Sequence, residues 1–370
     1  MRILLLSPYD ATSHQYWRTG LVKHFPQHDW TVLTLPPRYF SWRIRGNSLS
    51  WTCSERERLE QNYDVLIATS MTDLASLRGF IPGLARIPTL LYFHENQFAY
   101  PASKTKVESI EPQIVTLYGA IAADRLIFNS EFNRKTFLSG VKTLLKKLPD
   151  HAPLTIVSLL QKKSEVLMVP LEDCLWEIKH EANKTSSSSP LVITWNHRWE
   201  YDKGPEKLLA VVDELLTRSV NFKINILGQQ FRSSPVIFNE LEEKLRTTRN
   251  GKHLGTWGFI KDRARYFEIL KQSDIVLSTA IHDFQGLSML EAVALGCIPL
   301  APDTLVYPEW FPAEYLYSED QRGHTAVDKI LNWIEEKKNN KLPVAPDVKF
   351  LSWQSLSSRY ASAIDNTLER

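Results

Sequence analysis

Short apolar runs that alternate with helical patterns are the feature that most constrains the fold of this chain. In the first half, the runs RILLLS, WTVLTL, DVLIATS, TLLYFH and RLIFNS each end in a polar or turn residue. Helix-like stretches lie between them, around residues 14–25, 52–60, 72–79 and 107–122. Alternation of this kind is typical of βαβ units and predicts a parallel sheet.

A linker-like segment, HEANKTSSSSP at residues 180–190, interrupts this series. The alternation then restarts with the runs LVITWN, FKINILG, GTWGF, DIVLST and CIPLA. Helices are predicted from about Pro205, Val236 and Asp262, and no internal sequence repeat is present. The two halves therefore share a type of architecture rather than a repeated unit.

The predicted fold class is α/β, with two doubly wound parallel-sheet domains that face a central cleft. A length of 370 residues agrees with two domains of ordinary size. We place the first domain at residues 1–180 and the second at 181–350. Residues 351–370 are expected to form a C-terminal helix that packs back toward the first domain.

Composition limits the classes of partner. The net charge of +2 gives no overall electrostatic case for nucleic acid, so such a partner must bind to a local basic patch. Three scattered cysteines show no metal-ligand spacing and indicate reduced thiols in the cytoplasm. The start, MRILLLSPYD, is read as a buried strand, and no apolar run is long enough to span a membrane.

Polar residues collect where the predicted strands of the first half end. Ligands of parallel sheets gather at the carboxyl ends of strands. In this chain those ends carry Ser7, Ser70, His94 with Glu95, and Asn129 with Ser130.

Two cations follow the first strand of the second half, in TWNHRWEYDKGPEKLL. Arg198 and Lys203 stand five positions apart beside a helix that begins at Pro205. A guanidinium fork, an ammonium and a helix amino terminus together suit a diphosphate. The alternative is a solvated loop in which Glu200 and Asp202 pair with the two cations.

The stretch HDFQGLSMLEAVALGCIP places carboxylates at Asp283 and Glu291 around a helix that begins at Gly286. Glu291 lies about one turn into an apolar helix, and a buried carboxylate without a partner is costly. The two vicinal hydroxyls of a ribose would satisfy both of its oxygens. Alternatively, Glu291 is a first-turn acid favoured by the helix dipole, or it pairs with an arginine elsewhere in the chain.

Taken together, these motifs resemble the retaining GT-B glycosyltransferases, which use nucleotide sugars. By this resemblance, Arg198 and Lys203 match the diphosphate pair and Glu291 matches the ribose-binding glutamate. Asp283 falls on the first glutamate of the Glu-x7-Glu pattern, which contacts the donor sugar. The chain departs from the family here, because it has aspartate for glutamate and DFQG where E-x-F-G is usual.

The resemblance also covers the donor base and the leaving group. GTWGFI matches the strand and turn that hold the base through the backbone, around Gly258 and Phe259. The amides of Gly286 and Leu287, with the two cations, are expected to stabilise the negative charge that develops on the departing diphosphate. No metal site is predicted, since the chain has no Asp-x-Asp pair and no His/Cys cluster with ligand spacing.

The first half resembles a narrower group, the tRNA-queuosine mannosyltransferases, through SPYDATSHQYW, YFHENQFAYP and FNSEFNR. These enzymes move mannose from GDP-mannose to the queuosine base of the tRNA-Asp anticodon. The resemblance implies a catalytic group of His94, Asp283, Arg198 and Lys203, with the donor as a substrate and no cofactor. The residues expected to meet the acceptor are Ser13, His14, Glu95, Asn96, Gln97, Asn129 and Ser130.

Ordinary structural roles remain open for several of these residues, because a helix cap near Ser13 or at Ser130 and a turn cap at Glu95 to Gln97 fit equally well. Two further readings also stay open: a GT-B transferase with a lipid or polysaccharide acceptor, and a non-catalytic module that binds tRNA or a nucleotide sugar. The sequence does not predict an oligomeric state.

Two segments are candidates for the tRNA contact. Residues 38–51, RYFSWRIRGNSLSW, mix arginines with aromatic rings, a combination that holds RNA through phosphates and base stacking. Residues 142–163 are rich in lysine. For the lysine-rich segment we favour a solvated helix face, and for residues 38–51 an RNA contact.

Overall fold

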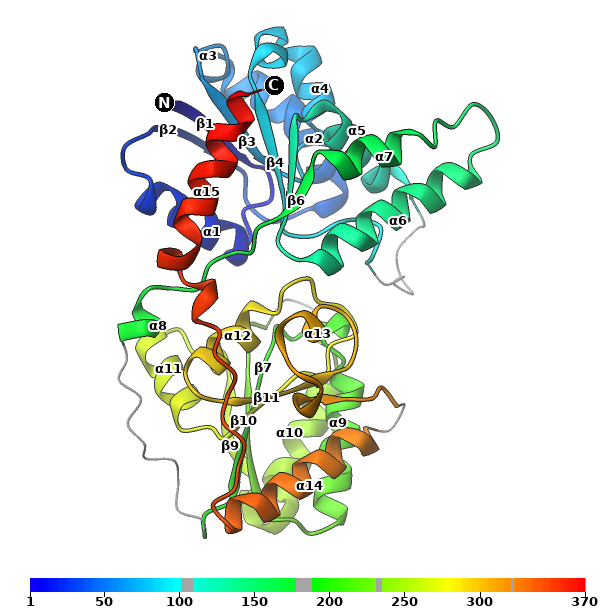
Figure 1. Cartoon of the computed structure of the whole chain (residues 1–370). Helices are drawn as coiled ribbons and strands as arrows, with labels where there is room; N and C mark the ends of the chain where they lie inside the picture. Colours follow the sequence, from blue (N-terminus) through cyan, green and yellow to red (C-terminus); the bar gives the residue numbers. More distant parts are fainter. Residues whose placement is uncertain (101–108, 178–187, 231–234, 321–322, 370) are drawn as a thin grey trace. The chain divides into compact units, whose positions relative to one another are not determined.

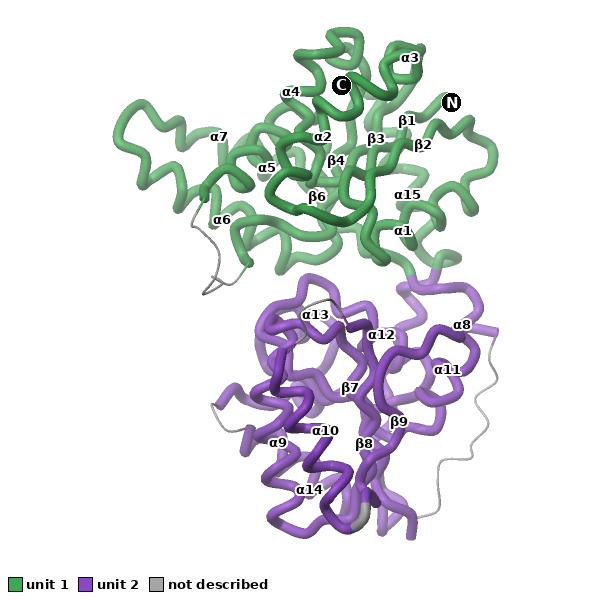
Figure 2. Tube along the Cα trace, turned by 180° about the vertical axis from the view of Figure 1, so that it is seen from behind, with its two compact units in different colours: residues 1–170, 353–370 green, residues 171–352 purple. Residues whose placement is uncertain are grey.

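The computed structural model describes residues 1–100, 109–177, 188–230, 235–320 and 323–369. The chain divides into two compact units (Figure 2). Unit 1 comprises residues 1–170 and 353–370, and unit 2 comprises residues 171–352. Most of the linker-like segment at residues 180–190 lies outside the described residues. The units meet in the chain at Pro170 and Leu171, before the predicted boundary at residue 180.

Unit 1 is built on a six-stranded parallel sheet with the strand order β2-β1-β3-β4-β5-β6 (Figure 1). The strands are β1 (Arg2–Ser7), β2 (Asp29–Thr34), β3 (Val65–Thr69), β4 (Thr89–Phe93), β5 (Arg125–Phe128) and β6 (Ser164–Val166). Its α-helices are α1 (Thr12–His24), α2 (Phe40–Ser54), α3 (Arg56–Leu59), α4 (Leu74–Phe80), α5 (Glu111–Ala122), α6 (Glu131–Lys147), α7 (Ile156–Lys162) and α15 (Trp353–Leu368), with a 3-10 turn η1 (Pro82–Arg86).

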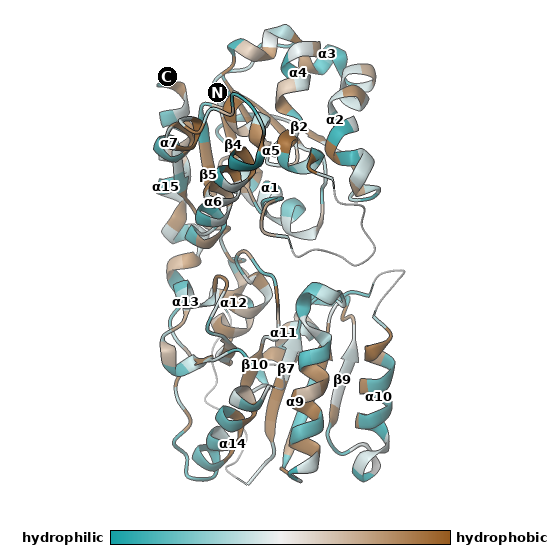
Figure 3. Ribbon diagram, turned by 90° about the vertical axis from the view of Figure 1, so that its right-hand side faces the viewer, coloured by the Kyte–Doolittle hydropathy of each residue, from teal (hydrophilic) through white to brown (hydrophobic). Residues whose placement is uncertain are grey.

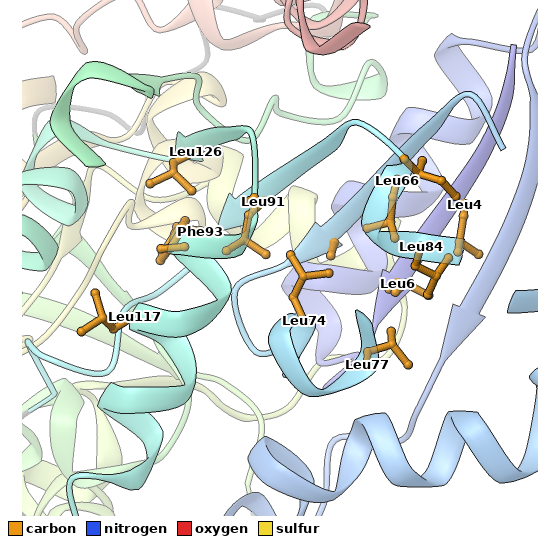
Figure 4. Packing of buried hydrophobic residues seen from close by; sticks show 14 of the residues in the cluster. Leu4, Leu6, Leu66, Leu74, Leu77, Leu84, Leu91, Phe93, Leu117 and Leu126 are labelled. Carbon is orange, nitrogen blue, oxygen red and sulfur yellow. The ribbon is translucent and has the colours of Figure 1, made fainter. Parts of the chain in front are cut away.

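Both faces of this sheet are buried, as its nearly continuous apolar strands predict. Alternate strand residues point to opposite faces. Figure 4 shows the core on one face, where strand residues pack against α4, η1 and α5. Its labelled members are Leu4, Leu6, Leu66, Leu74, Leu77, Leu84, Leu91, Phe93, Leu117 and Leu126.

The opposite face is covered by α1 and α15, from the two ends of the chain (Figure 1). The Trp17 ring of α1 stacks on Tyr92 of β4 at 4.1 Å between centroids. Its indole N–H donates to the Tyr360 hydroxyl of α15 at 3.0 Å. Trp353 lies against Gly20, where a Cβ would come within 2.2 Å of the indole ring. Unit 1 therefore contains the last helix of the chain as part of its core.

Unit 2 also has a six-stranded parallel sheet, with the order β12-β11-β10-β7-β8-β9. The strands are β7 (Leu191–Asn196), β8 (Phe222–Leu227), β9 (Leu254–Gly258), β10 (Ile275–Leu277), β11 (Ile298–Pro302) and β12 (Leu316–Tyr317). The α-helices are α8 (Cys174–Glu177), α9 (Pro205–Thr217), α10 (Ile237–Thr247), α11 (Arg263–Lys271), α12 (Leu287–Ala294), α13 (Tyr307–Trp310) and α14 (His324–Lys338). Its 3-10 turns are η2 (Tyr201–Lys203), η3 (Thr248–Gly251), η4 (Ala313–Tyr315) and η5 (Lys349–Leu351).

Hydropathy follows this layered arrangement (Figure 3). Strand β7 is predominantly hydrophobic, whereas much of α10 is hydrophilic. Helix α10 buries only Phe238, Leu241 and Leu245, which recur at helical spacing. The prediction of two doubly wound parallel sheets is thus confirmed. Within the described ranges, no helix is both long and apolar enough to cross a membrane.

Candidate active site

The loop after β7 carries the predicted diphosphate cations of unit 2. Lys203 ends the short turn η2, and Gly204 then adopts a left-handed conformation (φ +64°) before α9. A Cβ at Gly204 would lie 2.0 Å from the Thr279 carbonyl oxygen, so only glycine allows this approach. The Thr279 hydroxyl donates to the Lys203 carbonyl at 2.9 Å. These contacts fix the loop after β7 against the loop after β10.

Lys203 lies between two carboxylates, and its side chain is 9% exposed. Its ammonium donates to the His282 carbonyl at 2.7 Å and lies 3.2 Å from Asp202 and 3.7 Å from Asp283. Two residues that sequence analysis placed on the diphosphate and on the sugar thus form one ion pair. Asp202 also pairs with Lys203, as the solvated-loop alternative anticipated, but the site is buried.

Arg198 lies in a different environment. Its side chain is 49% exposed and pairs with Glu200 at 3.1 Å. This pairing is the one that the alternative reading anticipated. An exposed ion pair of this kind contributes little and can exchange for another anion. Arg198 is therefore the cation of this loop that a ligand in solution can reach.

Asp283 is held at the amino end of α12 by three contacts. Its carboxylate accepts from the Gly286 amide at 3.0 Å and from the Tyr307 hydroxyl at 3.1 Å, in addition to pairing with Lys203. Burial raises the pKa of Asp283, but Lys203, the neighbouring histidines and the Tyr307 hydrogen bond outweigh it and hold the pKa below its usual value. The Gly286 amide is occupied by Asp283, so the helix amides that remain for an anion begin at Leu287.

Glu291 on α12 pairs with Arg263, a residue that sequence analysis did not identify. The guanidinium of Arg263 at the start of α11 makes a short contact with Glu291 and also binds Glu172 at 3.0 Å. Tyr266 donates to Glu291 at 3.4 Å. Burial raises the pKa of the Glu291 carboxyl, and Arg263 opposes that shift. The alternative of an arginine partner is therefore correct, and each carboxylate oxygen keeps lone pairs for a further donor.

The predicted base-binding turn follows β9. Gly258 has a left-handed backbone (φ +98°), and the Phe259 side chain is 54% exposed. Asp262 then caps α11 by accepting from the Ala264 amide at 3.0 Å. The turn therefore leads directly into the helix that begins with Arg263.

Unit 1 holds a second group of polar residues, at the carboxyl edge of its sheet. His94 follows β4 and stacks on His14 of α1, with 4.1 Å between ring centroids. His14 Nε2 lies 3.1 Å from the Glu95 carboxylate. Burial, with a smaller effect from His14, lowers the pKa of His94 well below its usual value, so the ring is neutral. His94 Nε2 is buried, and none of the described residues forms a hydrogen bond with it.

Three of the other predicted acceptor residues, Asn96, Asn129 and Ser130, form hydrogen bonds that hold the loops of unit 1 in place. Asn96 Nδ2 donates to Asn133 Oδ1 at 2.8 Å, and Asn129 Nδ2 donates to the His94 carbonyl at 2.8 Å. Ser130 caps α6 through the Asn133 amide at 3.0 Å. For Ser130 the structure therefore shows the ordinary helix start. Gln97 Nε2 contacts Met71 Sδ at 3.6 Å.

Ser13 is exposed on α1, and the N-cap residue of that helix, Ala11, makes no side-chain capping hydrogen bond. Within the described residues, several further polar atoms are buried without a hydrogen-bond partner. They include the hydroxyls of Thr69 and Thr72 in unit 1, and Asn196 Oδ1 and His197 Nε2 in unit 2, which were not selected from the sequence, and the hydroxyl of Ser7, which was named as a strand end. Most of these residues end or follow a strand, which is the signal that could have identified the ones missed. No group of three or more His, Cys, Asp or Glu residues is placed to hold a metal ion in the described part of the chain.

The two halves of the chain match two different families of known proteins. Residues 2–171 match the family described as tRNA-queuosine alpha-mannosyltransferase N-terminal, and residues 177–343 match glycosyl transferases group 1. A tRNA-queuosine alpha-mannosyltransferase of Drosophila melanogaster is 35% identical over 321 residues, which cover 85% of this chain and 83% of the fly protein. The chain belongs to the tRNA-queuosine alpha-mannosyltransferase family. Membership in this mannosyltransferase family confirms the predicted resemblance and makes the chain a hexosyltransferase.

Solved structures support the fold of this mannosyltransferase family member. Sucrose-phosphate synthase from Thermosynechococcus elongatus has a TM-score of 0.70 at 12% identity and covers 99% of this chain and 98% of its own. The Anabaena protein HepE, solved in complex with UDP, has a TM-score of 0.62 at 15% identity, with coverages of 100% and 97%. At these identities the likeness concerns the fold alone, and it confirms the GT-B class.

Proposed function

We propose that this chain transfers mannose from GDP-mannose to the queuosine base of tRNA-Asp, with retention of configuration at the sugar and without a metal. The observation that carries the proposal is the family relationship across 85% of the chain. The geometry of unit 2 adds physical support, because its polar groups match the parts of a nucleoside diphosphate sugar. We also propose that the reaction takes place in the cytoplasm, since Cys53, Cys174 and Cys297 form no disulfide.

In unit 2 the donor is proposed to lie along the carboxyl edge of the sheet. Phe259 and the Gly258 turn would hold the guanine, and Glu291 would accept hydrogen bonds from the ribose hydroxyls. The diphosphate would meet Arg198 and the α12 amides from Leu287 onward, where the helix dipole favours negative charge. Asp283, held ionised by the buried ammonium of Lys203, would accept from a mannose hydroxyl.

The transfer itself breaks the bond between mannose C1 and the phosphate oxygen, and the electron pair stays on the departing GDP. The acceptor hydroxyl oxygen bonds to C1 on the same face, and its proton passes to the departing phosphate. Arg198 and the α12 amides would lower the barrier, because donors placed at the departing phosphate stabilise the negative charge that develops on it. In unit 1, the neutral His94 and the His14–Glu95 pair offer hydrogen bonds to polyhydroxyl groups.

The test uses the purified chain with GDP-mannose and tRNA-Asp that either carries or lacks queuosine. The expected result is a mass gain of one hexose on the queuosine nucleoside only, with the alpha linkage. UDP-glucose replaces GDP-mannose in the control reaction. A hexose gain on a lipid or glycan acceptor, or none on queuosine, would overturn the proposal.

A further inference from the structure

The amino end of α2 in unit 1 presents two aromatic rings to solvent. Tyr39 is 74% exposed and adopts a left-handed backbone (φ +54°) just before the helix, and Trp42 is 54% exposed. Trp42 rests on Gly46, where a Cβ would come within 2.4 Å of the indole ring. One face of the Trp42 ring is thus supported by the helix. Large aromatic side chains usually bury most of their surface in the folded protein. Tyr39 and Trp42 do not, so a role in the hydrophobic core does not account for them.

Beside these rings lies an arginine that has no counter-ion among the described residues. Arg43 is only 8% exposed, and its buried Nε has no hydrogen-bond partner in the described part of the chain. In the segments of known structure, no carboxylate lies within 4 Å of it, whereas the next arginine, Arg45, pairs with Asp73 at 2.8 Å. Burial and the nearby positive charge of Arg38 lower the pKa of Arg43. A buried cation near another cation is costly, and an anion bound by both would relieve that cost.

This surface adjoins the loops that carry the acceptor residues of unit 1. Phe40 packs edge-on against Tyr9, in the loop after β1, at 6.1 Å. Asn47 donates to the Met71 carbonyl, in the loop after β3, at 3.1 Å. Met71 in turn contacts Gln97, after β4, through the 3.6 Å contact described above. The segment 38–47 is therefore fixed beside the strand ends where His94 and Glu95 lie.

We infer that residues 38–43 form an RNA-binding surface, in which Arg38 and Arg43 hold a backbone phosphate of the acceptor. Tyr39 and Trp42 stack on its bases. Arginine pairs bind phosphate through several hydrogen bonds, and exposed rings supported from below are the usual platforms for unstacked bases in RNA loops. The inference rests on the proposed function, because it names the part of the chain that contacts the tRNA. The proposed surface is shorter than the segment 38–51 predicted from the sequence, because Arg45 is neutralised by Asp73 and Trp51 is buried.

The test measures tRNA-Asp binding by fluorescence anisotropy at several salt concentrations. Arg38→Gln and Arg43→Gln should each weaken binding, and the double variant should lower the slope of log K against log salt by roughly 0.7 to 0.9, the value for one lost phosphate contact. Trp42→Leu should weaken binding roughly five- to hundredfold without changing that slope, whereas Trp42→Phe should restore most of it. Lys146→Gln on α6 is the matched control, because it removes one positive charge from the lysine-rich helix of the same unit.

Kinetics separate this inference from the proposed function. The surface variants should raise KM for tRNA and leave KM for GDP-mannose unchanged. If the wild-type chain modifies queuosine but Arg38→Gln, Arg43→Gln and Trp42→Leu bind tRNA as tightly as it does, the surface is wrong and the function stands. An equal loss of tRNA affinity in Lys146→Gln would also overturn the proposed surface, because the effect would then follow net charge alone. Circular dichroism and thermal unfolding check that Arg43→Gln is folded; if it is not, Arg38→Gln and Trp42→Leu decide.

Discussion

Replacing Arg263 tests whether this arginine keeps the Glu291 carboxylate ionised and oriented for binding a ribose. In Arg263→Met the guanidinium is lost, and Glu291 becomes a buried carboxylate with Tyr266 as its remaining partner among the contacts described above. A hydrogen bond to a charged group contributes about 1.5–3 kcal/mol when buried. Because the Arg263 side chain is 44% exposed, solvent screening reduces this to about 1–2 kcal/mol. Donor binding should therefore weaken about 5- to 30-fold.

The same variant should change how donor binding depends on pH. Burial already raises the pKa of Glu291, and loss of Arg263 removes the main influence that opposes this rise. A ribose needs the ionised form to accept two hydroxyl protons, so binding is lost as pH falls through the pKa. The variant should lose affinity at a higher pH than the wild type.

Isothermal titration with GDP from pH 5 to pH 8 measures both effects. Arg265→Met is the matched control, because it removes from the same helix an arginine that pairs with Glu268 instead of Glu291. A double-mutant cycle with Glu291→Gln should show strong non-additivity. Unchanged GDP affinity in Arg263→Met, or additive losses in the cycle, would refute the reasoning.

Three further predictions concern stability. The pKa of the buried His197 is lowered to about 4 by burial and by Lys203, so the unfolded chain binds a proton below pH 6.5 that the folded chain does not. Unfolding free energy should therefore fall by roughly 3 kcal/mol from pH 6.5 to pH 4, and denaturant titrations of His197→Asn should show a smaller fall. Lys337→Met leaves Asp274 buried without its 2.6 Å partner and should cost about 3–5 kcal/mol, measured by urea unfolding. Gly204→Ala should lower the melting temperature through its clash with Thr279, whereas Gly79→Ala in α4, with open space around it, should not.

The fold could be predicted because its strands and turns are determined by residues that are neighbours in the sequence. Buried strands such as Leu4 to Leu6 are continuous apolar runs, and the turn residues between them recur in both halves. Part of the site was predictable for a similar reason. Lys203 and Asp283 follow strands of the unit 2 sheet and His94 follows a strand of the unit 1 sheet, and the carboxyl ends of parallel strands share one edge of their own sheet.

The partners of these residues were not predictable, because they come from distant positions. No spacing rule connects Glu291 with Arg263, and the geometry that joins them is set by the packing of α11 on α12. Likewise, an asparagine after a strand suits either a ligand or a backbone carbonyl. Asn129 proved to bind the His94 carbonyl, which only the folded backbone reveals.

The position of α15 has a consequence for the order in which the protein is completed. Trp353 and Tyr360 supply contacts to Gly20 and Trp17, yet they are synthesised after every residue of unit 2. On the ribosome, unit 2 has its whole sequence available while unit 1 still lacks α15, one of the two helices that cover one face of its sheet. The unit that emerges first is thus the last to be completed, and until α15 is added the apolar surface that this helix covers stays exposed.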